Sequence, residues 1–283
     1  MTMQELHADQ FSRAQALVGA VPFNTLFARV VLARTVRGRV LVDDDVHPSV
    51  CLVVHKYGMA LLCGSPEKDS FNRELKGFLK NDSSNGGTAK WMICHPETWE
   101  PTLENLLGGD LTKAPSSMGE EVEGNRVPGT VVQTQRVNFR FHSKPLAHPT
   151  LPAGFALRRV DSDLYHRITG SVVPQAFWDN SEDFLRSGIG FSLLDEGRIV
   201  STCFSSFVVD DKLELGVETQ REYRGKGLSV FPTTETIEYC VSRGLEPVWA
   251  CRRENTPSFR LALKLGFTPV SDHPYYILPE QGR

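Results

Sequence analysis

Short apolar runs separated by polar turns follow one another along the second half of the chain, in an order typical of a mixed α/β fold. Period-two runs indicate strands, and apolar positions three to four residues apart indicate helices. Asp-Glu-Gly at 195–197 predicts a hairpin turn. A last helix is expected between an Asn-Thr-Pro start at 255–257 and a glycine stop at 266. The other expected strands lie at 155–160, 190–194, 198–209, 213–218 and 248–251, and the other expected helices at 161–168, 181–187 and 228–242.

The second half is expected to follow the order β-α-α-β-β-β-α-β-α-β. The first half repeats this order less clearly, as a strand, a hairpin, a glycine turn, a helix, a strand, a helix and a strand. We hypothesise that residues 1–145 form a degenerate copy of the second half, and an unrelated α/β cap is the alternative. The proline-rich segment 146–152 is the expected linker, because proline favours extended backbone. Residues 153–283 form the expected second domain. In the first half, strands are expected at 40–42, 50–54, 59–63, 91–94 and 130–141, and helices at 70–79 and after Pro96.

A basic, glycine-rich turn at 223–229 (Tyr-Arg-Gly-Lys-Gly-Leu-Ser) joins an expected strand to an expected helix. Gly225 and Gly227 let the backbone approach a ligand closely. The helix start offers unpaired N–H groups and the positive end of the helix dipole. Arg224 and Lys226 add positive charge. The spacing matches neither a Walker A loop nor a dinucleotide-binding fingerprint. The turn therefore predicts a different kind of pyrophosphate cradle.

The segments around this turn carry a family resemblance. After the strand at 248–251 come Asn255 and a helix that ends in Lys-Leu-Gly-Phe at 264–267. With Glu-Tyr-Arg-Gly-Lys-Gly at 222–227, this arrangement resembles the GNAT N-acetyltransferase superfamily. The superfamily motif reads Gln/Arg-x-x-Gly-x-Gly/Ala, so Glu222 departs from it at the first position. The resemblance implies a C-terminal GNAT fold with a mixed, splayed central sheet.

One branch of the superfamily is more similar than the rest. The segment 177–191 reads Phe-Trp-x₅-Phe-Leu-x-x-Gly-x-Gly-Phe. This style resembles a branch that has an N-terminal extension and includes the zwittermicin A resistance acetyltransferase. In the first half, Cys-Gly-Ser-Pro-Glu at 63–67 places an acid and a proline where a cradle needs N–H donors and basic charge. We therefore expect a single working cradle, in the second half.

The resemblance implies that acetyl-CoA is the co-substrate. Backbone N–H groups of the turn would bind its pyrophosphate, and the preceding strand would bind its pantetheine arm, with one N–H polarising the thioester carbonyl. Asn255 and Ser258 would lie across the arm, although Asn255 would also cap the helix. The expected cofactor-binding residues are Val217, Thr219, Arg224, Gly225, Lys226, Gly227, Leu228, Ser229, Asn255 and Ser258.

The general acid is where the sequence departs from the family. Many GNAT enzymes have a Tyr four residues before the glycine of Leu-Gly-Phe, and here that position is Ala262. Ser258 and Tyr276 are the expected catalytic donors, and Cys251, Tyr275 or water are alternatives.

Glu218, at the end of the cradle strand, is the candidate general base. Its alternative is a solvated charge at a strand end.

The acceptor amine is expected to contact the segment around residue 178. Trp178, Asp179 and Asp183 are the candidate substrate-binding residues, because an acid beside an aromatic ring suits a cationic amine. The alternative is that Trp178 packs in the core while Asp179 and Ser181 cap a helix.

Charge and composition limit the classes of binding partner that we expect. A formal net charge of −3 gives no reason to expect nucleic acid, and no apolar run is long enough to span a membrane. The N-terminus has no signal-peptide pattern. The six cysteines have no metal-ligand spacing, and the histidines form no cluster, so no metal is expected. We expect a cytoplasmic monomer or homodimer.

The leading hypothesis is an acetyl-CoA-dependent N-acetyltransferase acting on a primary amine of a small molecule. An amino-bearing antibiotic, and hence self-resistance, is the specific possibility that the branch suggests. Two alternatives stay open: a non-catalytic module that binds acyl-CoA, and an acyltransferase that uses a longer or carrier-bound acyl donor.

Overall fold

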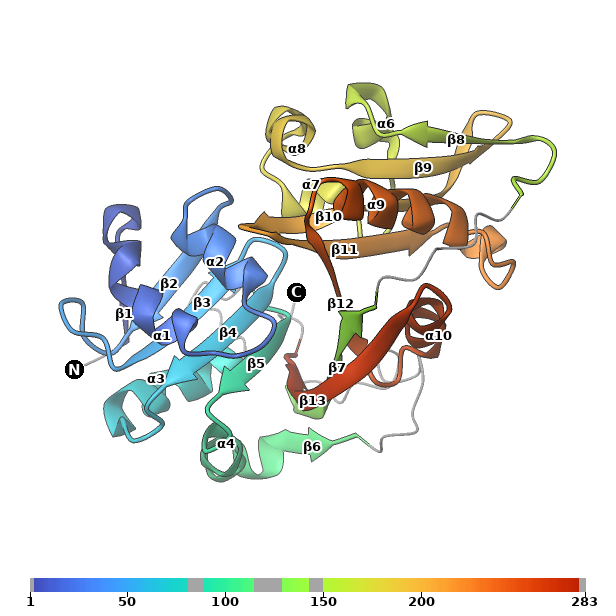
Figure 1. The fold of residues 1–283 in the computed structure, drawn as a ribbon. Coiled ribbons are helices and arrows are strands. Elements are labelled where there is room, and N and C mark those ends of the chain that lie inside the picture. The colour runs from blue at the N-terminus through green and yellow to red at the C-terminus, as the bar shows by residue number, and fades with distance from the viewer. Residues whose placement is uncertain (1–2, 81–88, 115–128, 143–149, 280–283) are drawn as a thin grey trace. The chain divides into compact units, whose positions relative to one another are not determined.

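The computed structural model describes residues 3–80, 89–114, 129–142 and 150–279, which form two compact units (Figure 1). The first unit consists of Met1–Asn138, Ala250–Thr256 and Ser271–Arg283, and the second of Phe139–Trp249 and Pro257–Val270. The units are not two consecutive segments, because the chain returns to the first unit twice. The expected linker at 146–152 lies partly outside the described residues.

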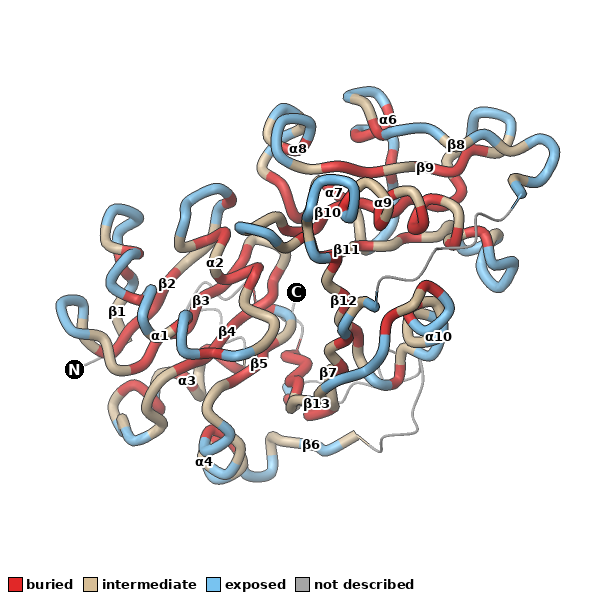
Figure 2. Tube along the Cα trace, in the orientation of Figure 1, coloured by how far each residue is buried: buried red, intermediate tan, exposed pale blue. Residues whose placement is uncertain are grey.

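The first unit contains strands in the order β1-β2-β3-β4-β5-β13. Neighbours run antiparallel except β4 and β5, which are parallel and joined by the crossover helix α3. Figure 2 shows β3 and β4 buried along nearly their whole length. The strands are β1 (Gln4–Glu5), β2 (Gly38–Val42), β3 (Val50–His55), β4 (Met59–Gly64), β5 (Trp91–His95), β6 (Leu111–Lys113), β7 (Val131–Phe141) and the end of β13 (Phe267–Ile277). The helices are η1 (Ala8–Ala14), α1 (Gln15–Gly19), α2 (Leu26–Leu32), α3 (Asp69–Leu79), α4 (Trp99–Leu107) and η3 (Gly108–Asp110).

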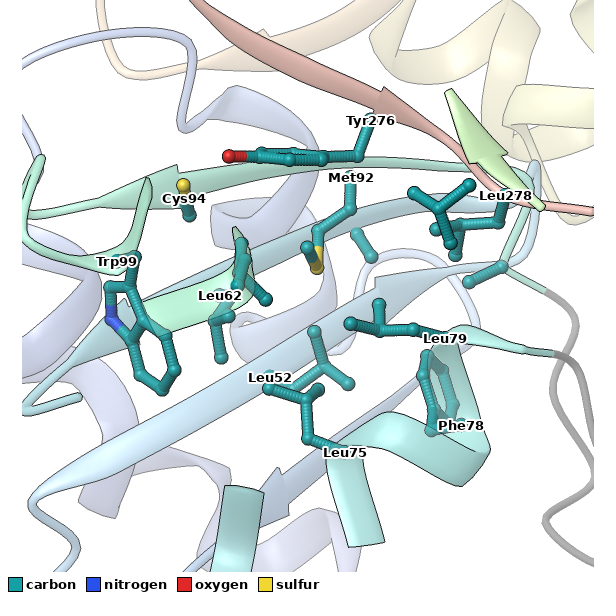
Figure 3. Close-up of a cluster of buried hydrophobic side chains, with 14 of the residues drawn as sticks. Leu52, Leu62, Leu75, Phe78, Leu79, Met92, Cys94, Trp99, Tyr276 and Leu278 are labelled. Atoms are coloured by element: carbon teal, nitrogen blue, oxygen red, sulfur yellow. The ribbon is translucent and has the colours of Figure 1, made fainter. Parts of the chain in front are cut away.

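Helices α3 and α4 cover one face of this sheet. Phe71, Leu75 and Phe78 recur every three or four positions of α3 and therefore lie on one side of the helix. They pack with alternate residues of β3 and β4 in the core cluster of Figure 3. The intervening residues, such as Val53 and Leu61, point to the other face and are buried as well. Helices α1 and α2 contact these two strands.

The last strand of the chain completes the first unit. Residues 275–277 of β13 pair antiparallel with residues 91–93 of β5. Tyr276 is fully buried in the cluster formed with α3 and α4, and its hydroxyl is directed toward Cys94 (Figure 3). Residues from both ends of the sequence therefore share one hydrophobic core.

The second unit contains strands in the order β12-β11-β10-β9-β8. Only β11 and β12 run parallel, and helix α9 connects them. The mixed α/β fold class predicted from the sequence is confirmed. No helix within the described ranges has the length and apolar character needed to cross a membrane. The elements are β8 (Phe155–Arg159), α6 (Ser162–Arg167), α7 (Pro174–Phe177), α8 (Ser181–Ser187), β9 (Gly190–Asp195), β10 (Arg198–Val209), β11 (Lys212–Thr219), η4 (Arg221–Tyr223), α9 (Val230–Ser242), β12 (Glu246–Arg252), α10 (Thr256–Lys264) and β13.

Side-chain caps and glycines set the helix boundaries. Asp161 caps α6 by accepting from the N–H of the third following residue, at 2.9 Å. Asn180 caps α8 in the same way at 2.8 Å, so the caps named in the alternative for this segment, Asp179 and Ser181, are wrong. Gly266, at φ +86°, follows α10 at the predicted stop.

Glu254, between β12 and α10, is a buried carboxylate of the first unit. Glu254 is 8% exposed, and neither of its carboxylate oxygens accepts a hydrogen bond from another described residue. Burial is the main cause that raises the pKa of Glu254 above its ordinary value, against the opposing charges of Arg252 and Arg253. The ionised form is therefore disfavoured in the folded protein.

We expect Glu254→Gln to raise the Tm at about pH 8 and to change it little near pH 4. An acid whose pKa rises on folding contributes its stability below the unfolded pKa, and this stability is lost as the pH increases toward the folded pKa. The neutral amide avoids that loss, so the Tm difference should grow with pH. Thermal unfolding measured across this range checks the prediction, and a difference that shrinks with increasing pH contradicts it.

We expect Tyr276→Ala to lower the free energy of unfolding by roughly 3–5 kcal/mol, the usual cost of removing a large buried aromatic side chain. Tyr276→Phe is the matched control, because it keeps the ring and removes only the hydroxyl. The control should lose less than about 1 kcal/mol. Urea unfolding of the three proteins measures both values, and equal losses for the two variants would refute the packing role.

Candidate active site

The predicted cradle is an exposed turn between η4 and α9 in the second unit. Gly225 and Gly227 adopt φ values of 76° and 72°, in the left-handed region that favours glycine. No atom lies within 4 Å of where a Cβ would stand at either glycine, so the turn is open to a ligand.

The backbone of the turn presents unused donors. The N–H groups of residues 225–229 donate to no acceptor within the described residues, whereas the N–H of Val230 already bonds to Gly227 O at 3.3 Å. Helix α9 begins at Val230, so the positive end of its dipole lies at this turn. A row of unpaired N–H groups at a helix start fits a pyrophosphate.

Side chains on both sides hold the turn in place. Leu228 is buried against Leu193 and Val200 of the neighbouring strands. Tyr223 donates its hydroxyl to Asp195 at 2.8 Å, and this hydrogen bond is the main cause that raises the pKa of Tyr223. Lys226 Nζ lies 4.9 Å from the centre of the Tyr223 ring. We did not predict the Tyr223–Asp195 support, because residues far apart in the sequence form it.

Strands β11 and β12 part next to the cradle. Their register ends at Glu214↔Val248, although β11 continues to Thr219. The N–H of Gln220 donates to Val200 on the β10 side. Because successive residues of a strand direct their N–H groups to opposite edges, those of Val217 and Thr219 face the edge that β12 leaves. This is the splay that we predicted.

The corresponding strands of the first unit do not part. Strands β4 and β5 pair in continuous register as far as Cys63↔His95. Trp99 then donates its indole N–H to Gly64 O at 3.0 Å, which occupies the carbonyl at the strand end. The first unit therefore offers no open strand edge at the position equivalent to the cradle.

Glu218 is buried at the end of β11, with 8% of its surface exposed. Its carboxylate accepts hydrogen bonds from Ser171, Val172 and Arg224. It is therefore not the solvated strand-end charge that we considered as the alternative to a general base. Arg224 also donates from Nε to Thr219 O at 3.0 Å.

Ser258 and Asn255 belong to different units. In the second unit, Ser258 Oγ accepts from Trp249 Nε1 at 3.2 Å. Asn255 belongs to the first unit, directly before α10. Its contact with a cofactor stays a prediction.

Tyr276 is placed away from solvent in the first unit. Its side chain has no exposed surface and packs in the core of Figure 3. Burial is the main cause that raises its pKa. Contrary to our expectation, we do not retain it as a catalytic donor, because a hydroxyl without exposed surface cannot reach the thiolate of a bound cofactor. Tyr275 and Cys251 are buried in the same unit, and Ala262 is buried in α10.

The candidate acceptor residues have separate roles. Trp178 is 6% exposed and donates its indole N–H to Ser205 O at 2.8 Å, which is a core position. Asp183, in the first turn of α8, accepts from Asn180 at 2.8 Å and pairs with Arg186.

The pKa of Tyr165 responds to burial and to acidic residues of the following segment. Burial first, and then the negative charges of Asp179 and Asp183, raise the pKa of Tyr165 to about 12. Within the part of the chain that the structure describes, no three His, Cys, Asp or Glu side chains gather to hold a metal ion.

Comparisons with known proteins agree with this geometry. A family model described as "GNAT acetyltransferase" matches residues 20–277. The chain is 25% identical over 277 residues to the uncharacterized N-acetyltransferase YdfB of Bacillus subtilis (strain 168), which covers 97% of this chain and 98% of that protein.

Solved structures extend the likeness over both halves. A GCN5-related N-acetyltransferase-like protein from Streptococcus suis 89/1591 has a TM-score of 0.70 at 23% identity, covering 96% of this chain and 99% of that chain. A tandem GNAT protein from the clavulanic acid biosynthesis pathway has a TM-score of 0.55 at 13% identity and covers 97% of each chain. The tandem match supports our hypothesis that the first half repeats the fold of the second. With a family model spanning nearly the whole chain, this protein belongs to the GNAT acetyltransferase family and is an N-acetyltransferase.

Proposed function

We propose that the protein transfers the acetyl group of acetyl-CoA to a primary amine of a small molecule. The observation that carries this proposal is the row of unpartnered N–H groups at 225–229, at the start of α9 and beside the open edge of β11. Cradle and edge together match the two parts of coenzyme A that need hydrogen bonds, the pyrophosphate and the pantetheine amides.

In the proposed reaction, the main task of the protein is to position the cofactor and the amine. The cradle N–H groups hold the pyrophosphate, and the outward N–H groups of Val217 and Thr219 are placed to bond the arm and to polarise the thioester carbonyl. The neutral amine attacks the carbonyl carbon, a C–N bond forms, the C–S bond breaks, and the sulfur leaves as thiolate. The attacking nitrogen loses a proton to water, and the thiolate receives a proton from water, directly or relayed through Ser258, because Tyr276 is buried.

A cationic acceptor suits the acidic residues near Tyr165. Asp179 and Asp183 add negative charge on the segment that follows α7. We do not include Trp178 in the proposed acceptor site, because its ring is buried and its indole N–H already donates to Ser205 O. The likeness of segment 177–191 to the zwittermicin A branch makes an amino-bearing antibiotic the acceptor that we propose to test first. All six cysteines are buried free thiols, which fits a reducing compartment such as the cytoplasm.

The second candidate function is a non-catalytic module that binds acyl-CoA. Ala262 favours it, because this buried methyl group stands where many family members have a Tyr. A donor with a longer or carrier-bound acyl chain is a third reading of the same open edge.

We expect free thiol to be released when the protein is mixed with acetyl-CoA and a panel of amines that includes spermidine, tyramine and kanamycin. A thiol-reactive dye measures the rate, and the acetylated amine is identified by mass. Coenzyme A binding at micromolar concentration without release from any amine would contradict the enzymatic proposal and favour the binding module. Release with acyl-CoA donors of longer chain only would favour the third reading.

We expect Gly227→Glu to weaken coenzyme A binding by at least about a hundredfold, because it adds a negative charge against the pyrophosphate and strains a left-handed position. The matched control is Gly244→Glu, which has φ +71°, no atom within 4 Å of its Cβ position, and a place just beyond the other end of α9. Isothermal titration with coenzyme A compares the two variants with wild type. Equal coenzyme A affinities for the two variants would contradict the placement of the pyrophosphate site at residues 225–229.

A further inference from the structure

Glu218 joins two segments that are far apart in the sequence. Its Oε2 accepts from Ser171 N at 2.9 Å, from Ser171 Oγ at 3.1 Å and from Val172 N at 2.9 Å. Its Oε1 accepts from Arg224 Nη2 at 3.2 Å. Each carboxylate oxygen has two lone pairs, so the three contacts to Oε2 fully occupy that oxygen, while Oε1 keeps one position beside Arg224. These four contacts hold the carboxylate in one place, which suits a positioning residue.

The turn at 169–172 is built around this carboxylate. Gly170 has φ +136°, and a Cβ there would lie 2.6 Å from both Cγ and Cδ of Glu218, which is closer than real Cβ contacts allow. Gln220 adds a second tie, because its Nε2 donates to Thr169 O at 2.9 Å and to Thr169 Oγ1 at 3.2 Å. The end of β11 therefore fixes the path of the turn.

The other partner, Arg224, lies at the start of the cradle turn. Its guanidinium is held at Nε by Thr219 O and at Nη2 by Glu218, and its side chain is 53% exposed. An arginine has five N–H donors, so the remaining donors stay available for an anion. Fixing the guanidinium beforehand lowers the entropy that a pyrophosphate would lose to order it.

The turn at 169–172 leads straight into the acceptor side. Pro174 starts α7 two residues after Val172, and Asp179 follows the end of that short helix. A shift of the turn would therefore move the start of α7. One buried carboxylate thus touches both the cofactor side and the acceptor side of the second unit.

We propose that Glu218 is a positioning residue that couples the cofactor cradle to the acceptor-side turn. This inference rests on the proposed function. It assigns to Glu218 the task of fixing Arg224 and the turn at 169–172 in one arrangement, in place of the proton transfer expected from the sequence.

The first test is Glu218→Gln. The amide keeps the size of the side chain, but its nitrogen cannot accept a hydrogen bond, so the ties to Arg224 and to the turn cannot both persist. We expect the Kd for coenzyme A to rise about tenfold in isothermal titration. With the amine that the panel identifies, we expect the amine KM to rise while the pH dependence of kcat keeps its wild-type shape. A different result would overturn the proposal and assign Glu218 to base catalysis. In that case the coenzyme A affinity would be unchanged, kcat would fall by about a hundredfold or more, and the pH profile of kcat would lose one limb.

Two further variants separate loss of charge and loss of folding from loss of coupling. Glu196→Gln removes the same charge from an exposed position of the second unit, in the turn between β9 and β10, and should leave the coenzyme A affinity within about twofold. Gly170→Ala leaves the carboxylate chemically intact but pushes against it, and it should raise the coenzyme A Kd as Glu218→Gln does. Should Glu218→Gln fail to fold, Gly170→Ala still tests the coupling, and an unchanged Kd in that variant contradicts it.

Hydrogen exchange measures the coupling without any amine. In wild-type protein, the peptide that contains Ser171 and Val172 should exchange more slowly when coenzyme A is added. In Glu218→Gln this response to coenzyme A should disappear, and a response equal to wild type would overturn the proposal. Wild-type protein that binds coenzyme A but acetylates no amine would refute the proposed function, while this exchange experiment would still decide the coupling.

Discussion

The parting of β11 from β12 is the constraint on which the candidate site depends. Two parallel strands that stayed paired would use the N–H groups of Val217 and Thr219 within the sheet, as β4 and β5 do in the first unit as far as Cys63. Because pairing stops at Glu214, one edge of the strand that leads to the cradle stays open. Glycine at 225 and 227 lets the turn beside this edge adopt left-handed backbone.

Much of this arrangement was predictable from local patterns. Strand and helix boundaries followed apolar periodicity, and Gly225, Gly227 and Gly266 marked positions where the backbone requires a left-handed conformation. The short elements η1, α1, α2, β1, η3, β6, α7 and η4 were missed, because a few residues give too little periodicity to recognise. The cap of α8 was misplaced by one residue, since Asn180 has polar neighbours on both sides that are equally able to cap.

Long-range contacts set the limit of sequence reasoning at the site. Nothing in the local sequence shows that Glu218 meets the turn at 169–172, or that Tyr276 packs in the core of the first unit. The expected acid and base were chosen by residue type and by position, and neither criterion indicates that Tyr276 and Glu218 are buried. Asp195, which supports Tyr223, carried no signal beyond its hairpin turn.

The pairing of β13 with β5 has a consequence for biosynthesis. While the ribosome is still making the second half, β5 lacks the neighbour that residues 275–277 later provide, and Met92 and Cys94 lack the Tyr276 side chain that closes their core. An unpaired strand edge beside exposed apolar side chains is a site where nascent chains associate wrongly. The amino-terminal unit of this protein is therefore finished last, although it is synthesised first.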